Sequence, residues 1–125
     1  MNTIINIKQR SEICVGALAD NLERLLPRGR VVVITDANID RLYHPLVECF
    51  EHIIIGNGET NKTLQTVENI YRQLMAMGAD RSTFLLGIGG GIVTDITGFV
   101  AATYMRGVEF GFVSTTLLGA VDASV

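Results

Sequence analysis

The chain has 125 residues, of which 48% are hydrophobic and 18% are charged, and its formal net charge is −3. These values fit one small folded domain and argue against a disordered segment. Acidic and basic residues are scattered along the chain, so we expect neither nucleic acid nor a membrane surface as a partner. No apolar stretch reaches the ~20 residues that span a bilayer, and the N-terminus lacks the apolar core of a signal peptide, so a cytoplasmic protein is expected.

Short β-branched segments alternate with helical patterns along the whole chain. Strands are predicted at residues 3–7, 30–36, 52–56, 83–89 and 109–115, and helices at residues 11–26, 38–50, 63–78, 93–105 and 115–125. This alternation predicts an α/β fold in which helices cover both faces of a parallel sheet. The two fully apolar strands, at residues 30–36 and 83–89, belong in the middle of that sheet.

Single residues mark several of the predicted helix ends. Ser11 is the expected N-cap of the first helix, Pro45 limits or kinks the second, and Gly78 ends the third. The last helix is still apolar at Val125, without a capping glycine or a polar tail. We therefore expect the 125 residues to be one domain of a longer protein.

The metal-binding residue types are sparse and isolated. Cys14 and Cys49 lack the spacing of a redox pair or a metal site, and His44 and His52 lack a second ligand nearby. No metal ligand is therefore predicted in this chain.

Four glycines, Gly87, Gly89, Gly90 and Gly91, lie between a predicted strand and a predicted helix. Strand, glycines and helix in this order form a phosphate cradle, because backbone N–H groups and the helix N-terminus can converge on an anion. The usual dinucleotide fingerprint is not met, since Ile92 or Thr94 occupies the place of its last glycine. Close packing of the helix on the sheet is an alternative reason for these glycines.

Polar residues follow other strands at the edge where parallel α/β sheets bind ligands. Asp36 and Asn38 follow the second strand, where a carboxylate commonly binds the ribose of adenosine. Glu59 can accept hydrogen bonds from ribose or adenine, and Lys62 can neutralise a phosphate. The alternative for this second segment is a solvated loop that caps the next helix through Thr60 or Asn61.

Three further positions are open to two interpretations. Asp95 either stabilises the dipole of its helix or contacts a ligand, and Arg106 is either a surface charge or an anion ligand. Thr115 and Thr116 end the last predicted strand and could cap the helix that follows.

Long segments of the chain resemble the 3-dehydroquinate synthase family. They are "VVVITDANIDRLY" at 31–43, "GETNKTLQ" at 58–65, "GGGIVTDITGFVAATYMRG" at 89–107 and "STTLLGAVDASV" at 114–125. The resemblance implies that residues 1–125 form an amino-terminal, Rossmann-like NAD-binding domain, followed in the family by a helical domain that holds Zn²⁺ or Co²⁺. It also implies a homodimer.

The resemblance implies an activity in the shikimate pathway of aromatic amino acid biosynthesis. The family enzyme, a lyase, converts 3-deoxy-D-arabino-heptulosonate 7-phosphate to 3-dehydroquinate and phosphate, with NAD reduced and regenerated within each turnover. The glutamate and two histidines that hold the metal have no counterpart in these 125 residues. We therefore expect the chain alone to lack synthase turnover and to bind NAD weakly or not at all.

The resemblance also assigns roles to individual residues. The cofactor-binding residues that it implies are Asp36, Asn38, Glu59, Lys62, Gly90, Gly91, Asp95, Thr115, Thr116 and Leu118. Asp122 would reach the substrate or the nicotinamide, and Arg106 would hold substrate in a neighbouring subunit's site. Alternatives are another NAD-dependent sugar-phosphate cyclase, a polyol dehydrogenase, or a non-catalytic module that binds NAD or dimerises.

A full-length enzyme carrying this chain is predicted to prefer NAD strongly over NADP. A 2′-phosphate next to the Asp36 carboxylate would place like charges a few ångströms apart, which costs about 1 kcal/mol in water and several in a poorly solvated site. No arginine adjoins Asp36 in the sequence to offset that repulsion. Asp36→Ala should weaken NAD binding. It should also reduce the difference between the dissociation constants for NAD and NADP. Equal affinity for both cofactors in the unmodified enzyme would contradict the prediction.

Overall fold

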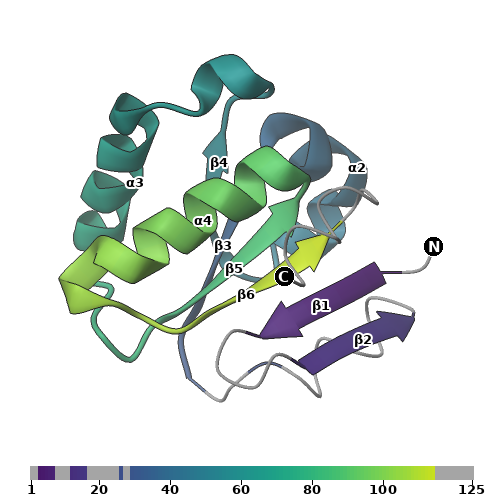
Figure 1. Ribbon diagram of the computed structural model, residues 1–125, viewed down its shortest axis with the longest axis horizontal. Helices are drawn as coiled ribbons and strands as arrows, with labels where there is room; N and C mark the ends of the chain where they lie inside the picture. Colours follow the sequence, from purple (N-terminus) through teal and green to yellow (C-terminus); the bar gives the residue numbers. More distant parts are fainter. Residues whose placement is uncertain (1–2, 8–11, 17–25, 27–28, 115–125) are drawn as a thin grey trace.

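The computed structural model describes residues 3–7, 12–16, 26 and 29–114, and within them six strands form one mixed sheet (Figure 1). The strand order is β2-β1-β6-β5-β3-β4. The strands are β1 (Thr3–Ile7), β2 (Glu12–Gly16), β3 (Val31–Asp36), β4 (Glu51–Ile55), β5 (Phe84–Gly89) and β6 (Phe110–Ser114). The helices are α2 (Ala37–Val47), α3 (Leu64–Ala76) and α4 (Gly91–Thr103), with short 3-10 turns η1 (Glu59–Asn61) and η2 (Tyr104–Arg106).

The central strands of the sheet are parallel and apolar, as the sequence predicts. β3 pairs in parallel with β4 and β5, and β5 pairs in parallel with β6. Val32, Val33 and Ile34 are fully buried, and every residue of β5 is buried. Strands covered on both faces need apolar side chains in both directions, which is why these runs do not alternate with polar residues.

Helices cover both faces of the sheet, which confirms the predicted fold class. Val32 and Ile34 point into the core beneath α3 and α4, which contribute residues such as Ile70. Val33 points to the other face, where it packs in one cluster with Ile39 of α2. Successive strand residues alternate between faces, so one strand supplies both cores.

The N-terminal part of the chain differs from the prediction. Residues 12–16 form strand β2 rather than a helix, with Cys14 opposite Ile5 in an antiparallel ladder, and β1 also runs antiparallel to β6. The sheet is therefore not wholly parallel. β-Branched Ile13 and Val15 favour a strand once a partner edge is available, and β1 provides that edge. The rest of the predicted helical face, and the predicted helix at 115–125, lie outside the described residues.

The helix ends show which side chains act as caps. Thr63 caps α3 by accepting a hydrogen bond from the Thr66 backbone N–H at 3.2 Å, so the predicted caps at Thr60 and Asn61 are wrong. Pro45 lies inside α2, where Tyr43 has a non-helical φ of −125°, as expected for a kink near proline. α3 ends ahead of Gly78, whose φ is +73°.

α4 approaches β5 so closely that two of its glycines leave no room for a side chain. A Cβ at Gly87 would lie 2.6 Å from Thr97 Oγ1, and one at Gly89 would lie 2.8 Å from Val93 Cγ2. Close packing between helix and sheet therefore explains Gly87 and Gly89. The Thr97 hydroxyl is buried by this contact and has no hydrogen-bond partner within the described part of the chain.

Two substitutions at this contact should have opposite effects on stability. Gly87→Ala should lower the free energy of unfolding by about 1–3 kcal/mol, because its methyl group overlaps Thr97. Thr97→Val keeps the side-chain shape and removes an unpaired buried hydroxyl, so its effect should be neutral or stabilising within about 1 kcal/mol. Urea unfolding followed by circular dichroism measures both. A Gly87→Ala chain as stable as the parent would show that α4 can move away from β5 at no cost.

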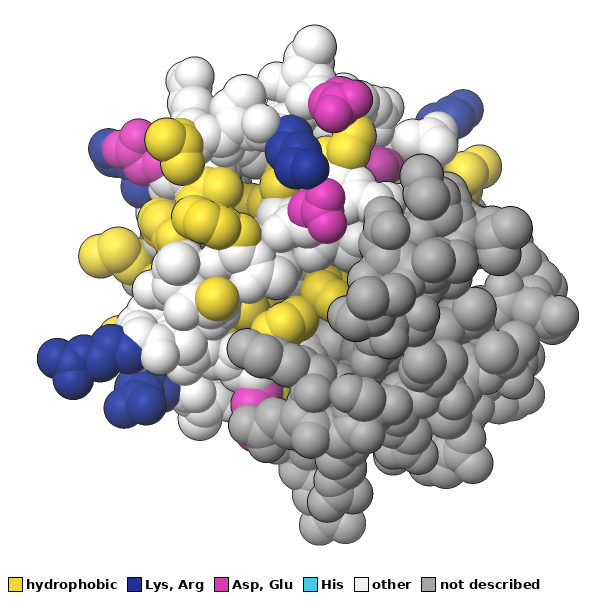
Figure 2. Space-filling model, viewed as in Figure 1, with side chains coloured by type: hydrophobic (Ala, Val, Ile, Leu, Met, Phe, Trp, Pro, Cys, Tyr) yellow, Lys and Arg dark blue, Asp and Glu magenta, His cyan; other side chains and the backbone are white. Residues whose placement is uncertain are grey.

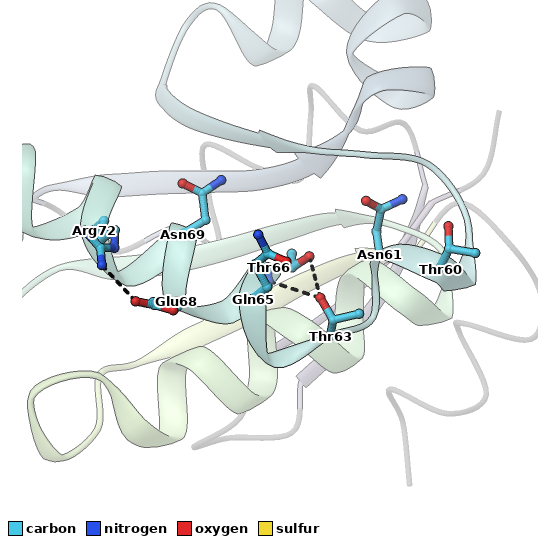
Figure 3. A pocket seen from close by; sticks show the side chains of 8 residues that line it. All are labelled: Thr60, Asn61, Thr63, Gln65, Thr66, Glu68, Asn69 and Arg72. Atoms are coloured by element: carbon cyan, nitrogen blue, oxygen red, sulfur yellow. Dashed lines mark hydrogen bonds and ion pairs between the residues drawn. The ribbon is translucent and has the colours of Figure 1, made fainter.

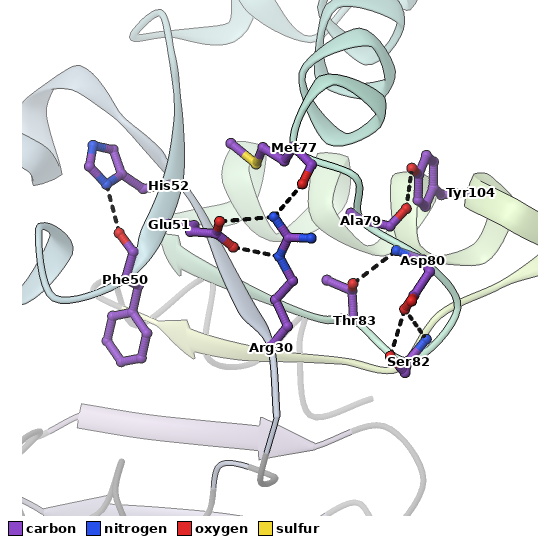
Figure 4. Close-up of polar contacts among 10 residues, drawn as sticks. All are labelled: Arg30, Phe50, Glu51, His52, Met77, Ala79, Asp80, Ser82, Thr83 and Tyr104. Carbon is purple, nitrogen blue, oxygen red and sulfur yellow. Dashed lines mark hydrogen bonds and ion pairs between the residues drawn. The ribbon is translucent and has the colours of Figure 1, made fainter.

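An arginine links three segments at the amino edge of the strands (Figure 4). The Arg30 guanidinium donates from Nε to Glu51 Oε2 at 2.5 Å, and from Nη2 to Glu51 Oε1 at 2.8 Å and to the Met77 carbonyl at 2.5 Å. It thus joins the starts of β3 and β4 to the C-terminus of α3. The hydrogen bond from Arg30 holds the pKa of the Glu51 carboxyl below its ordinary value.

The Glu51 contact should stabilise the fold near neutral pH and not in acid. Because the pKa of Glu51 is lower in the folded state, its contribution is present above the unfolded pKa and is lost as the pH falls through the folded pKa. Glu51→Gln should therefore lower the urea midpoint at pH 7, and the difference from the parent should shrink below about pH 4. Glu68→Gln, which removes an exposed partner of Arg72 on α3, serves as the control. A Glu51→Gln effect that does not change with pH would contradict this prediction.

Candidate functional site

The strand order creates a topological switch point between β3 and β5. After β3 the chain crosses through α2 on one face to β4, and after β5 it enters α4 on the other face. The loops that leave the carboxyl ends of these two neighbouring strands therefore diverge, and this is where open α/β sheets bind ligands. The Thr35 hydroxyl donates to the Ile88 carbonyl at 2.7 Å, which fixes the two strand ends against each other.

The N-terminus of α4 lies at this switch point and has no side-chain cap. Gly90 occupies the N-cap position, Gly91 is the first helical residue, and no side chain accepts a hydrogen bond as the N-cap. The first backbone N–H groups of a helix have no partner within the helix, and its dipole is positive there. This end of α4 is therefore suited to an anion such as a phosphate.

The N-terminus of α2, on the other side of the switch point, is capped by protein groups. Asp36 Oδ1 accepts from the Ile39 backbone N–H at 2.8 Å, and Asn57 Oδ1 accepts from the Asn38 backbone N–H at 2.9 Å. Side-chain oxygens thus already occupy two of the amides that could bind an anion. The contrast singles out α4 as the anion-binding end.

An ion pair connects the loop after β4 with α4. Lys62 Nζ lies 2.9 Å from Asp95 Oδ2, and about half of each side chain is exposed. Lys62 is held in place by this contact, within one turn of the helix end that carries Gly91. The structure thus brings these two predicted site residues together.

The loop after β4 places Glu59 at the same edge of the sheet. Glu59 is exposed and begins η1, directly after Gly58, whose φ is +88°. The Asn61 side chain donates from Nδ2 to the Asn57 carbonyl at 2.6 Å, which closes this loop on itself. Asp36, Asn38, Glu59, Lys62, Gly90, Gly91 and Asp95 are thus assembled at the carboxyl edge of the strands.

One arginine lies near the predicted adenosine end. From the sequence, Arg41 is expected beyond the turn that follows Asp36, too far away to offset a 2′-phosphate there. In the structure Arg41 Nη2 donates to Asn38 Oδ1 at 2.6 Å, so its guanidinium contacts another predicted residue of that end. Because Asp36 also caps α2, Asp36→Asn is the better variant for the cofactor test, since asparagine caps a helix as well as aspartate does.

Arg106 lies apart from the other site residues. It follows α4, whose 13 residues separate it from Gly91 by about 20 Å at the usual rise per residue. Met105 and Arg106 have φ angles of +48° and +69°, in the left-handed region that non-glycine residues rarely adopt. The remaining predicted residues, Thr115, Thr116, Leu118 and Asp122, lie outside the described residues.

Residues 52–125, more than half of the chain, match the family model described as 3-dehydroquinate synthase N-terminal. The chain belongs to this family. A curated 3-dehydroquinate synthase from Ruminiclostridium cellulolyticum is 38% identical over 97% of this chain and 37% of its own length. The chain therefore spans a little over one third of that relative.

Two solved structures of related enzymes resemble the chain. A 2-deoxy-scyllo-inosose synthase superposes with a TM-score of 0.68 at 23% identity, over 88% of this chain and 35% of its own. That likeness confirms the fold. A 2-epi-5-epi-valiolone synthase from Streptomyces hygroscopicus subsp. jinggangensis, described with NAD⁺ and Zn²⁺ bound, superposes with a TM-score of 0.57 at 27% identity. It covers 74% of this chain and 27% of its own.

Two hollows adjoin the N-terminal part of α3. An apolar groove of about 290 Å³ runs between α3 and α4, and Figure 2 shows hydrophobic side chains gathered over these helices. It is lined by Lys62, Thr63, Leu64, Val67, Asp95, Ile96 and Phe99. A polar hollow of about 630 Å³ lies along η1 and α3 (Figure 3), and none of its lining residues comes from β3, β5 or the glycine loop. The apolar groove, which contains the Lys62–Asp95 pair, is thus the one that borders the candidate site.

The described residues contain neither a metal cluster nor a membrane-spanning helix. No three His, Cys, Asp or Glu side chains in the described part of the chain gather closely enough to hold a metal ion. None of the helices described there is long and apolar enough to cross a membrane.

Proposed function

We propose that this chain is the NAD-binding part of a 3-dehydroquinate synthase. That enzyme converts 3-deoxy-D-arabino-heptulosonate 7-phosphate to 3-dehydroquinate and phosphate, and it works in the cytoplasm. The observation that carries the proposal is the uncapped N-terminus of α4 at the switch point between β3 and β5. Membership in the 3-dehydroquinate synthase N-terminal family supports the same function.

The described residues of this edge would serve the adenosine ribose and the pyrophosphate of NAD. Backbone N–H groups at the start of α4, with Gly90 and Gly91, would hold the pyrophosphate, and Lys62 would neutralise part of its charge. Asp36 and Asn38 would bind the adenosine ribose. When bound, NAD supplies a hydride acceptor for a ring hydroxyl of the substrate.

The rest of the cofactor and substrate site is part of the same proposal. Glu59 and Asp95 would contact NAD, as would Thr115, Thr116 and Leu118, and Asp122 would reach the substrate or nicotinamide. A Zn²⁺ or Co²⁺ ion would be held by residues outside this chain. The valiolone synthase described with NAD⁺ and Zn²⁺ supports this pairing of cofactor and metal.

We also propose that the enzyme is a homodimer in which Arg106 serves the partner's site. α4 is a continuous helix, so it holds Arg106 about 20 Å from the anion-binding end in the same chain. At that distance the Arg106 guanidinium cannot reach an anion bound at the start of its own α4. A second copy related by two-fold symmetry can supply the arginine.

A chimera would test the activity. We would join this chain to the remaining part of the Ruminiclostridium cellulolyticum synthase, replacing the aligned segment. The chimera should release phosphate from the heptulosonate substrate only when NAD is present, and the 125-residue chain alone should release none. An NAD-binding chimera without phosphate release from this substrate would contradict the proposed reaction and leave NAD binding in place.

The same chimera tests the shared site. Arg106→Ala and Asp95→Ala should each lower kcat/KM by about 100-fold or more, as expected for lost contacts to substrate and cofactor. An equal mixture, refolded together, should recover about a quarter of the parent activity, because half of the dimers are mixed and each mixed dimer has one intact site. No recovery would show that Arg106 acts within its own chain.

A further inference from the structure

Two hydrogen-bond donors from separate segments meet at Asn57, a residue that the sequence analysis did not single out. Its side-chain oxygen accepts from the Asn38 backbone N–H at 2.9 Å, across 19 residues of sequence. Its carbonyl accepts from the Asn61 side chain at 2.6 Å. Asn57 thus joins the start of α2 to the turn η1.

The first contact fixes the loop that carries Asp36 and Asn38. Asp36 caps the Ile39 amide from within α2, whereas Asn57 caps the Asn38 amide from the next loop. Losing the Asn57 oxygen would leave that amide to water and free the start of α2 to move relative to the loop after β4.

The second contact fixes the loop that carries Glu59 and Lys62. Asn61 ends η1 and folds back onto Asn57, and there is no spare room beneath it: a Cβ at Gly56 would lie 2.5 Å from Asn61 Oδ1. The position of η1 therefore depends on Gly56 and Asn57 together.

We propose that Asn57 is a positioning residue for dinucleotide binding, which holds the adenosine-side loop and the η1 loop at a fixed separation. This inference rests on the proposed NAD-binding function. Asn57 itself need not touch the ligand, because its effect passes through Asn38 on one side and through Asn61 on the other. Both loops must be correctly spaced at once, since NAD would contact Asn38 and Lys62 together.

The test is a calorimetric titration with NAD of the full-length chimera described above, made as the parent and four variants. Asn57→Ala should weaken NAD binding on the order of ten-fold, as expected for a lost hydrogen bond and two less ordered loops. Asn57→Asp keeps the acceptor for the Asn38 amide and should bind within about two-fold of the parent. Gly56→Ala leaves Asn57 intact but displaces Asn61, so it should also weaken binding several-fold. Asn69→Ala, at an exposed asparagine of α3, is the matched control.

Amide hydrogen exchange on the same proteins separates positioning from general stability. In Asn57→Ala, exchange should accelerate at Asn38 and Lys62, while the core amides of β3 and β5 stay protected. Loss of protection in those strands would show a purely structural role and overturn the inference. NAD binding by Asn57→Ala equal to that of the parent would also overturn it. If the parent chimera does not bind NAD, the proposed cofactor site fails, and this inference fails with it.

Discussion

The close contact between α4 and β5 determines where the site can form. Gly87 and Gly89 allow Thr97 and Val93 to lie directly on the strand, so the helix axis runs close above β5. The helix begins two residues after β5 ends, and its N-terminal amides therefore open over the switch point. A side chain at either glycine would push α4 away and move the anion-binding end with it. Gly87 and Gly89 serve the packing of α4 on β5, whereas Gly90 and Gly91 form the uncapped start of that helix.

The loops around this end are connected by polar contacts rather than by the apolar core. Asn57 joins the start of α2 to the η1 loop, and the Lys62–Asp95 ion pair joins the same η1 loop to α4. A half-exposed ion pair contributes only about 0–1 kcal/mol to folding stability. The Lys62 ammonium could therefore leave Asp95 and contact a bound anion at little cost. The rigid elements fix the location of the site, the Asn57 hydrogen bonds fix the spacing of its loops, and the weaker Lys62–Asp95 pair can rearrange.

Sequence patterns predicted the elements whose signals are local. The apolar runs of β3 and β5, the spacing of α3 and the strand–glycine–helix order of α4 all lie within short windows. Residues 12–16 were misassigned because five residues fit a helix or a strand equally well, and only the distant edge of β1 decides between them. Asn57 was missed for a similar reason, since its partner Asn38 is 19 residues away. The sequence also left open whether the glycines serve helix packing or anion binding. The contact between Thr97 and Gly87, which shows that packing is one reason, is visible only in the structure.

The turn after α4 is strained, and the surrounding contacts hold it in that state. Left-handed φ angles at Met105 and Arg106 cost on the order of 1 kcal/mol each or more. Tyr104 anchors the turn through its hydroxyl, which donates to the buried Ala79 carbonyl at 2.8 Å, and the Val108 amide bonds back to Ala101. Arg106 therefore lies on a well-anchored turn at the amino edge of the parallel strands, opposite the N-terminus of α4. Because a whole helix separates Arg106 from the N-terminus of α4, motion of this turn alone cannot bring the two together within one chain.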